Sequence, residues 1–147
     1  MLVHGSCAAR EGDAVLLLGA PGAGKSDLLL RLMHQGWQLV ADDQVECAED
    51  NRARAPDALR GMIEIRGLGL FEGLETAADA TLRLAVRLTP GQKPARLPEP
   101  ALWQDGPGAP LPLIALDPFE ASAPARLAFA LSAATGQLRS RAGAFAA

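Results

Sequence analysis

The stretch LLLGAPGAGKSDLLLRLM, from Leu16 to Met33, places a loop of small residues and one lysine between two strongly apolar segments. Residues 19–26 fit the pattern G-x-x-x-x-G-K-[ST], preceded by an apolar strand pattern and followed by a helical one, as that motif requires. Small residues let successive backbone N–H groups point inward at phosphate oxygens. The stretch therefore predicts a phosphate-binding loop, with Lys25 on the β and γ phosphates and the Ser26 hydroxyl on Mg²⁺.

This loop and the start of the helix supply the candidate nucleotide-binding residues. They are Gly19, Ala20, Pro21, Gly22, Ala23, Gly24, Lys25, Ser26 and Asp27. A glycine-rich turn with a chance GKS is the competing interpretation, which the flanking segments disfavour. The motif indicates phosphate binding, but it does not name a reaction.

Length and composition fit one globular domain over residues 1–147. Hydrophobic residues make up 49% of the chain, charged residues 21%, and tyrosine is absent, so we expect an aliphatic core. The net charge of −3 gives no positive field that would favour nucleic acid or an anionic membrane. Cys7 and Cys47 fit neither a metal spacing nor a secreted disulfide pattern. With no signal peptide and no apolar run of the ~18 residues that span a membrane, we expect a cytoplasmic protein.

Hydrophobic periodicity and turn residues predict an α/β map. Two strands, over 2–10 and 14–19, are joined by a turn at Gly12 and Asp13. The later elements are a helix over 26–35, a strand over 37–43, a hairpin over 45–56, strands over 62–67 and 81–88, a Pro- and Gly-rich loop over 90–112, a strand over 112–116 and a helix over 122–134. In the 81–88 strand, strict alternation would place one set of side chains on one face, namely Leu82, Leu84, Val86 and Leu88.

Acidic and basic side chains follow the loop at positions suited to catalysis. Asp42 and Asp43 end the strand after the loop helix, where one acid could hold Mg²⁺ and the other could take a proton from an attacking hydroxyl; a solvated turn is the alternative. Glu64 and Arg66 share a strand face, which a surface ion pair would also explain, although nearby glycines favour close backbone approach. His4, taken alone, is more often a structural histidine.

Three segments together resemble a known family. In order and spacing, GAPGAGKSD (19–27), QLVADDQVE (38–46) and APDALRGMIEIRGLGLFE (55–72) resemble the catalytic domain of HPr kinase/phosphorylase. That bacterial enzyme phosphorylates a serine of the phosphotransferase carrier protein HPr and reverses the reaction with inorganic phosphate. The likeness covers about half of the chain and fades after Thr76. It implies a P-loop α/β fold of the PEP carboxykinase-like type, with a mixed β-sheet core, a P-loop helix and a C-terminal helix.

The resemblance also implies roles for individual residues. Asp42 would be the general base toward the serine hydroxyl and the general acid in phosphorolysis, working beside the loop lysine. Asp43 and Glu64 would serve the metal together with the loop serine. His4 would lie close to the reacting phosphoryl group, and Arg66 would lie near the phosphate site. The implied small molecules are Mg²⁺ and a phosphoryl donor, either ATP or pyrophosphate.

The resemblance further implies a short form consisting of the catalytic domain only, a homo-oligomer such as the family's hexamer, and an HPr-like carrier as partner. Two other functions stay open. A small-molecule P-loop kinase would usually carry an arginine-rich lid, whereas the 90–112 segment is poor in arginine. A catalytically silent nucleotide-binding regulatory module would be expected to have lost an acid from the Asp42–Asp43 pair, and both acids are present.

Overall fold

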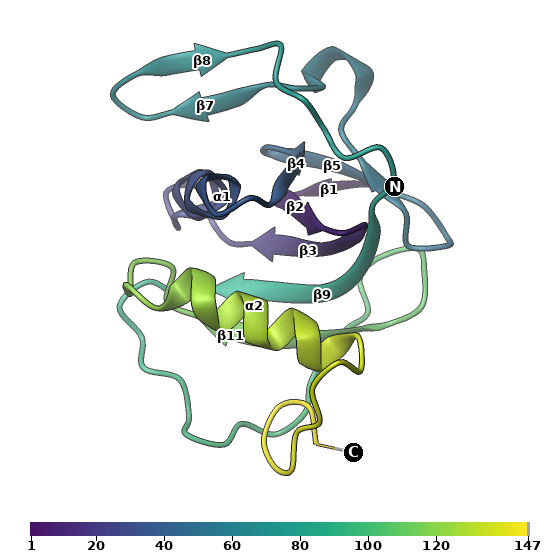
Figure 1. Ribbon diagram of the computed structural model, residues 1–147, viewed down its shortest axis with the longest axis vertical. Coiled ribbons are helices and arrows are strands. Elements are labelled where there is room, and N and C mark those ends of the chain that lie inside the picture. Colours follow the sequence, from purple (N-terminus) through teal and green to yellow (C-terminus); the bar gives the residue numbers. More distant parts are fainter. Residues whose placement is uncertain (147) are drawn as a thin grey trace.

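The structure, a computed structural model, describes residues 1–146. Its elements in chain order are β1 (Leu2–His4), β2 (Ser6–Arg10), β3 (Asp13–Leu18), α1 (Lys25–His34), β4 (Gln38–Ala41), β5 (Gln44–Cys47), β6 (Ala53–Arg54), a 3₁₀ turn (Asp57–Leu59), β7 (Ile63–Ile65), β8 (Gly69–Phe71), β9 (Thr81–Leu88), β10 (Leu102–Trp103), β11 (Leu111–Leu116) and α2 (Ala123–Ala134). Together they form a mixed α/β fold with the expected P-loop helix and C-terminal helix (Figure 1).

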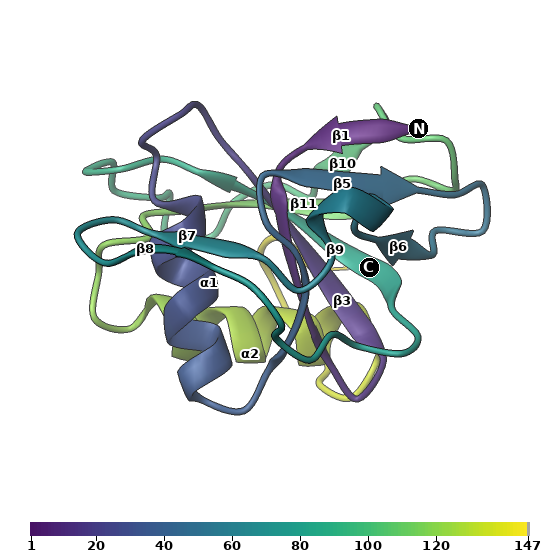
Figure 2. The ribbon, with the colours of Figure 1, turned by 90° about the horizontal axis from the view of Figure 1, so that it is seen from above.

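Six strands form the main sheet, in the order β10-β11-β9-β3-β2-β4. Strands β3, β9 and β11 are parallel, whereas β2 is antiparallel to both β3 and β4. A smaller sheet, β1-β5-β6, packs on one face, and both helices pack on the other (Figure 2). The β7–β8 hairpin lies beyond α1, so α1 lies between the hairpin and the main sheet (Figure 1).

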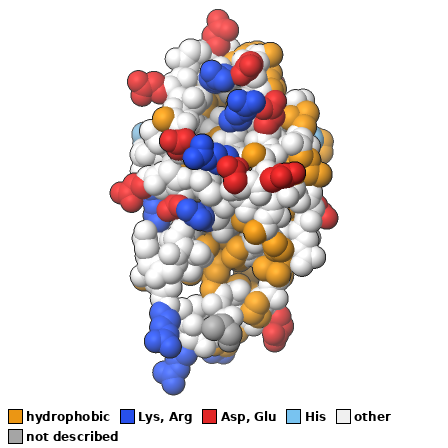
Figure 3. Space-filling view, turned by 90° about the vertical axis from the view of Figure 1, so that its right-hand side faces the viewer, with side chains coloured by type: hydrophobic (Ala, Val, Ile, Leu, Met, Phe, Trp, Pro, Cys, Tyr) orange, Lys and Arg blue, Asp and Glu red, His pale blue; other side chains and the backbone are white. Residues whose placement is uncertain are grey.

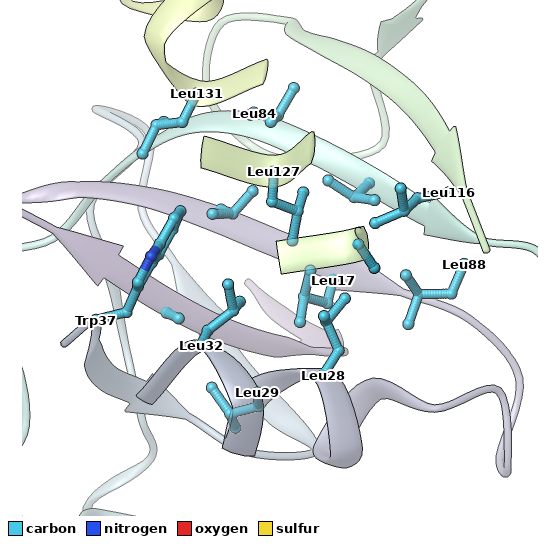
Figure 4. Close-up of a cluster of buried hydrophobic side chains, with 14 of the residues drawn as sticks. Leu17, Leu28, Leu29, Leu32, Trp37, Leu84, Leu88, Leu116, Leu127 and Leu131 are labelled. Carbon is cyan, nitrogen blue, oxygen red and sulfur yellow. The ribbon is translucent and has the colours of Figure 1, made fainter. Parts of the chain in front are cut away.

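The central strand β3 shows why the opening stretch is apolar without alternation. Val15 and Leu17 face the helices, and Leu16 and Leu18 face the smaller sheet. A strand covered on both faces reads as a continuous hydrophobic run, because neither face meets water. On the helix side, leucines from both helices and the sheet converge with Trp37 in an almost wholly aliphatic core (Figure 4).

The helices end and begin close to their predicted positions. In α1, Leu28, Leu29 and Leu32 face the core, which accounts for the helical spacing of the leucines. Gly36, with φ 93°, follows the helix end and confirms the predicted stop. In α2, Ser122 occupies the N-cap position, but its hydroxyl accepts a hydrogen bond from Arg126 instead of capping a backbone N–H.

The prediction of a single strand over 2–10 is wrong, because two strands, β1 and β2, are separated at Gly5. β1 pairs with β5 in the smaller sheet, whereas β2 enters the main sheet. A Cβ at position 5 would lie 2.7 Å from the carbonyl oxygen of Leu17, so only glycine allows the crossing. The following turn lies at Glu11 and Gly12, both with positive φ, and Asp13 already belongs to β3. The break matters for function because it places His4 and Ser6 on different sheets.

The strict alternation predicted for 81–88 is also wrong at Leu82, the first of the four side chains expected on one face. The pairing of β9 with β3 shifts register between Ala14 and Val15, which leaves Arg83 as the extra residue of a bulge. Leu82 therefore faces the smaller sheet, while Leu84, like Val86 and Leu88, faces the helices.

The segment predicted as one loop over 90–112 contains a strand. β10 pairs antiparallel with β11, and Trp103 is buried against the smaller-sheet side of the core. The charged side chains on the face seen in Figure 3 are of both signs and interspersed, with no extended basic surface. No helix within residues 1–146 combines the length and apolar character needed to cross a bilayer.

Candidate active site

The loop between β3 and α1 is shaped by glycines that no other residue could replace without strain. Gly22 and Gly24 have φ values of 82° and 99°, a region that side chains disfavour. At Gly19, a Cβ would lie 2.9 Å from the Cβ of Ala23, so this turn must also stay free of side chains. α1 begins at Lys25, directly after the loop, and its first N–H groups have no partner within the helix. This is the arrangement of an anion-binding helix start.

Lys25 is buried and folds back over the loop. Its Nζ donates hydrogen bonds to the carbonyl oxygens of Gly19 at 2.7 Å and Ala20 at 3.1 Å. The ion pairs found among residues 1–146 do not include this ammonium group. A buried cation held only by carbonyl dipoles would be further stabilised by an entering anion. The loop therefore carries a preplaced positive charge at its mouth.

The carboxylate of Asp42 accepts hydrogen bonds from residues of three other elements. Its Oδ1 accepts hydrogen bonds from the hydroxyl of Ser6, at 2.9 Å, and from the hydroxyl of Ser26, at 2.8 Å. Its Oδ2 accepts a hydrogen bond from the backbone N–H of Glu64 at 3.2 Å. These donors come from β2, α1 and β7, while Asp42 itself follows β4. The carboxylate is thereby fixed in orientation and tied directly to the loop serine.

Asp43 points differently from its neighbour because the chain turns between them. It has a φ of 70°, in the left-handed region, and its carbonyl oxygen accepts a hydrogen bond from the Gly5 N–H at 3.0 Å. Its Oδ1 lies 3.0 Å from Nε2 of His4, and these two side chains are 66% and 55% exposed. The pair forms a second, solvent-facing layer beside the partly buried Ser6–Asp42–Ser26 contacts.

An open pocket of about 930 Å³ joins these groups to the β7–β8 hairpin. Its lining includes most of the predicted site residues, namely His4, Pro21, Gly22, Gly24, Lys25, Ser26, Asp27, Asp43, Glu64 and Arg66. β7 ends at Ile65, so Arg66 lies in the hairpin turn and does not share a strand face with Glu64 as predicted. Both still reach the pocket, because the hairpin folds over the start of α1.

The other predicted residues contribute around this pocket. Three residues of the loop do not line the pocket, namely Gly19, Ala20 and Ala23. Asp42 is also absent from the lining, but it hydrogen-bonds Ser26, which is part of it. Asp27 lines the pocket while its carboxylate pairs with Arg31 at 3.1 Å.

Sequence reasoning missed two residues of the site. Ser6 is fully buried, and its hydroxyl donates to Asp42 and accepts from the Asp43 N–H at 3.3 Å. A polar residue at the start of a strand, followed by three small apolar residues, was the available signal. Phe119 lines the pocket from the loop after β11, more than ninety residues from the phosphate-binding loop, and no motif marks it.

The cysteines lie outside the site. Burial raises the pKa of the Cys7 thiol, with a further contribution from Cys47. Burial also raises the pKa of Cys47, against the opposing influence of the nearby N-terminal ammonium. Both thiols are therefore protonated and shielded at neutral pH, as expected for core residues.

The oxygen groups of the site fit a hard divalent cation. Ser26, Asp42, Asp43 and Glu64 offer hydroxyl and carboxylate oxygens, the donors that Mg²⁺ prefers. Within the described part of the chain, no three His, Cys, Asp or Glu side chains form a ready-made metal cage. Where Mg²⁺ is held by only one or two carboxylates, water and substrate phosphates complete its coordination.

Comparisons with known proteins place these features in a family. HPr kinase/phosphorylase of Caldanaerobacter subterraneus subsp. tengcongensis is 45% identical over 74 residues, which are 48% of this chain and 24% of that protein. HPr kinase/phosphorylase of Bacillus cytotoxicus is 35% identical over 91 residues, which are 59% of this chain and 29% of that protein. The matches thus span less than a third of the relatives' own lengths.

A solved structure extends the likeness to the whole fold. The HPr(Ser) kinase/phosphatase from Coxiella burnetii superposes with a TM-score of 0.75 over 95% of this chain and 99% of that chain, at 20% sequence identity. The expected α/β class is thereby confirmed. The family model for the HPr Serine kinase C-terminal domain matches residues 1–93, further than the likeness seen in the sequence motifs. Because that match covers more than half of the 147 residues, this chain belongs to the HPr serine kinase C-terminal domain family.

Proposed function

We propose that this chain is the catalytic domain of a Mg²⁺- and ATP-dependent protein kinase that phosphorylates a serine of an HPr-like carrier protein, and that it also removes the phosphoryl group by phosphorolysis. One observation carries the proposal. The phosphate-binding loop, the Asp42–Asp43 pair and the Glu64–Arg66 hairpin lie around a single pocket, with Ser26 hydrogen-bonded to Asp42. The names of the relatives support the choice of HPr as substrate.

Phosphate binding is assigned to the loop and to Lys25. The N–H groups at the start of α1 and the buried ammonium would hold the β and γ phosphates of the donor. Arg66, on the opposite wall of the pocket, adds a second cation near the transferring group. Phosphoryl transfer depends mainly on such positioning and charge neutralisation, since little covalent work is left to the protein.

Mg²⁺ would be held by Ser26 with Asp43 and Glu64, and when bound it would neutralise charge on the donor phosphates. Asp42 would take the proton of the attacking serine hydroxyl. In that step the serine oxygen bonds to the γ-phosphorus, the bond from that phosphorus to the bridging oxygen breaks, and ADP leaves. In the reverse step an oxygen of inorganic phosphate bonds to the phosphoserine phosphorus, the bond from that phosphorus to the serine oxygen breaks, Asp42 returns the proton to the serine oxygen, and pyrophosphate leaves.

The solvent-facing end of the pocket fits an acceptor carried on another protein. His4 and Asp43 are more than half exposed, so a serine on a protein surface can reach the site without entering a closed cavity. Nothing observed in the pocket favours the small-molecule kinase or the silent regulatory module. We extend the proposal to a cytoplasmic, homo-oligomeric protein, in keeping with an acceptor of the phosphotransferase system.

The test is incubation of the purified chain with Mg²⁺, ATP and the HPr-like protein of the same organism, followed by intact-mass measurement. We expect one added phosphoryl group on the carrier, lost in Lys25→Ala. Lys93→Ala, an exposed lysine outside the pocket, is the matched control and should retain full transfer. Absence of carrier phosphorylation by the wild-type chain, under conditions where it binds ATP, would overturn the proposal.

The division of work between the two acids is tested by separate readouts. Asp42→Asn should abolish transfer while changing the Mg²⁺ requirement little, whereas Asp43→Asn should raise the Mg²⁺ concentration needed for half-maximal rate. If Asp43→Asn abolished transfer and Asp42→Asn raised the Mg²⁺ requirement, Asp43, paired with His4, would be the general base and Asp42 the Mg²⁺ ligand.

A further inference from the structure

We propose that the ring of Phe119 stacks on the base of the phosphoryl donor, so that the site selects a nucleoside triphosphate over pyrophosphate. The inference rests on the proposed function and adds to it the residue that would recognise the base of the donor. Phe119 lies in the loop between β11 and α2, outside the residues matched by the family model.

The ring lies directly against the phosphate-binding loop. A Cβ at Gly24 would be 2.9 Å from Cζ of Phe119 and 2.9 Å from Cγ of Pro118. Gly24 is the N-cap of α1, the point at which donor phosphates would meet the helix N-terminus. Phe119 is therefore next to the phosphate site, within the reach of a nucleoside attached to those phosphates.

The loop that carries Phe119 is held in place from two sides. The Phe119 N–H donates to Oδ1 of Asp117 at 3.0 Å. The guanidinium of Arg31, on α1, donates to the Pro118 carbonyl oxygen and also pairs with Asp27. A loop backbone that is fixed before the ligand arrives loses less conformational entropy on binding, which favours stacking by the side chain that it carries.

The ring is exposed where a core aromatic would be covered. Phe119 is 57% exposed, yet it lines the same pocket as Lys25 and Ser26. Leu30 and Leu68 line this pocket as well, and both are exposed. The pocket thus combines a charged phosphate end with apolar side chains, which matches the two halves of a nucleotide.

The sheet order separates the base from the acceptor. The phosphate-binding loop follows β3, and Asp42 follows β4 on one flank of that strand, whereas Phe119 follows β11 on the other flank. The acceptor serine must approach the Asp42–Asp43 side. The Phe119 side is therefore free for the part of the donor that does not react, which in ATP is the nucleoside and in pyrophosphate does not exist.

The experiment compares ATP with inorganic tripolyphosphate, which carries the same phosphate chain without a base. Binding of each, with Mg²⁺, is measured by calorimetry for Phe119→Ala and for Phe129→Ala. Phe129 is 71% exposed on α2 and does not line the pocket, so it is the matched control. Phe119→Ala should weaken ATP binding by about tenfold, the order expected for loss of a base–aromatic stack, and leave tripolyphosphate binding unchanged. Phe129→Ala should change neither.

A second variant gives a signal from the contact itself. Phe119→Trp should retain ATP affinity, and its added fluorescence should change on ATP binding but not on tripolyphosphate binding. Unchanged ATP affinity in Phe119→Ala would overturn the proposal, as would equal weakening of both ligands. A slower transfer to the carrier with normal ATP affinity would place the ring against the acceptor instead. Lys25→Ala distinguishes a failure of the stacking proposal from a failure of the proposed function. If Lys25→Ala leaves the affinity for both ATP and tripolyphosphate intact, the phosphate site itself is wrongly assigned.

Discussion

Replacing Ser6 with alanine removes one of the contacts that orient Asp42. Ser6 is fully buried, and its Oγ donates to Asp42 Oδ1 at 2.9 Å. The same oxygen accepts the Asp43 N–H at 3.3 Å, a longer contact that contributes less. The substitution leaves the backbone and the phosphate-binding loop in place, so it separates orientation of the acid from binding of the donor.

The expected loss of stability follows from the negative charge of Asp42, which accepts the hydrogen bond from Ser6. Hydrogen bonds to charged groups contribute roughly 1.5–3 kcal/mol, so Ser6→Ala should lower the free energy of unfolding by about 2 kcal/mol. In a chain of this size that corresponds to a Tm lower by roughly 4–8 °C. Because Asp42 loses one of its fixed contacts, we expect the turnover number for carrier phosphorylation to fall by about tenfold. KM for ATP should stay unchanged.

Stability is measured by urea denaturation, followed through the buried Trp37 and Trp103, and turnover by the intact-mass assay. Ser132→Ala is the control, because the Ser132 hydroxyl accepts a hydrogen bond from Arg10 at 3.1 Å outside the pocket. Because Ser132 is only partly buried, Ser132→Ala should lower stability by about 1.5 kcal/mol, the lower end of the range for a hydrogen bond to a charged group, and leave turnover intact. If Ser6→Ala lost stability but kept full turnover, the reasoning that Asp42 must be held by Ser6 would be refuted.

Three other perturbations have defined outcomes. Gly5→Ala should lower the free energy of unfolding by about 1–3 kcal/mol, because its Cβ would meet the Leu17 carbonyl oxygen at 2.7 Å, and unchanged urea denaturation would contradict the crossing described here. Raising the pH from 7 to 10 should destabilise the fold above about pH 8.5, where unfolded thiols ionise, because burial raises the pKa of Cys7 and Cys47 in the folded chain. The chain has no tyrosine, so a Cys7→Ala, Cys47→Ala double variant should lose most of this pH dependence in denaturation curves. Chelation of Mg²⁺ with EDTA should abolish carrier phosphorylation and added Mg²⁺ should restore it; transfer that persists without divalent cations would exclude the proposed metal role.

Local patterns predicted the positions of the β3–α1 loop and of the two helices well. The loop, the leucine spacing of α1 and the stop at Gly36 depend on residues close together in the chain. The same holds for the hairpin predicted over 45–56, which the structure confirms as the antiparallel pair β5 and β6. Such features are set by backbone sterics and helical periodicity, which a sequence displays directly.

The errors arose where distant segments decide the geometry. Gly5 breaks its strand because Leu17, on the neighbouring strand, leaves no room for a side chain. Leu82 changes face because β9 bulges at Arg83 against β3. Neither cause is visible in the local pattern, since each depends on the neighbouring strand β3.

The candidate site divides in the same way. The predicted Asp42 and Asp43 follow β4 of the main sheet, and His4 ends β1 of the smaller sheet, where its ring contacts Asp43. Ser6 and Phe119 were missed since a single serine or phenylalanine carries no motif. Their importance lies in tertiary contacts, to Asp42 in one case and to Gly24 in the other.

The central claim is that the pocket transfers a phosphoryl group between a nucleotide and a protein serine. ³¹P NMR of one reaction containing the chain, Mg²⁺, ATP and the HPr-like carrier tests it most directly. We expect the ATP γ signal to be replaced by a phosphoserine signal, and then, after removal of nucleotide and addition of inorganic phosphate, the phosphoserine signal to be replaced by pyrophosphate. Loss of the γ signal with only inorganic phosphate appearing would show transfer to water, and would contradict the account.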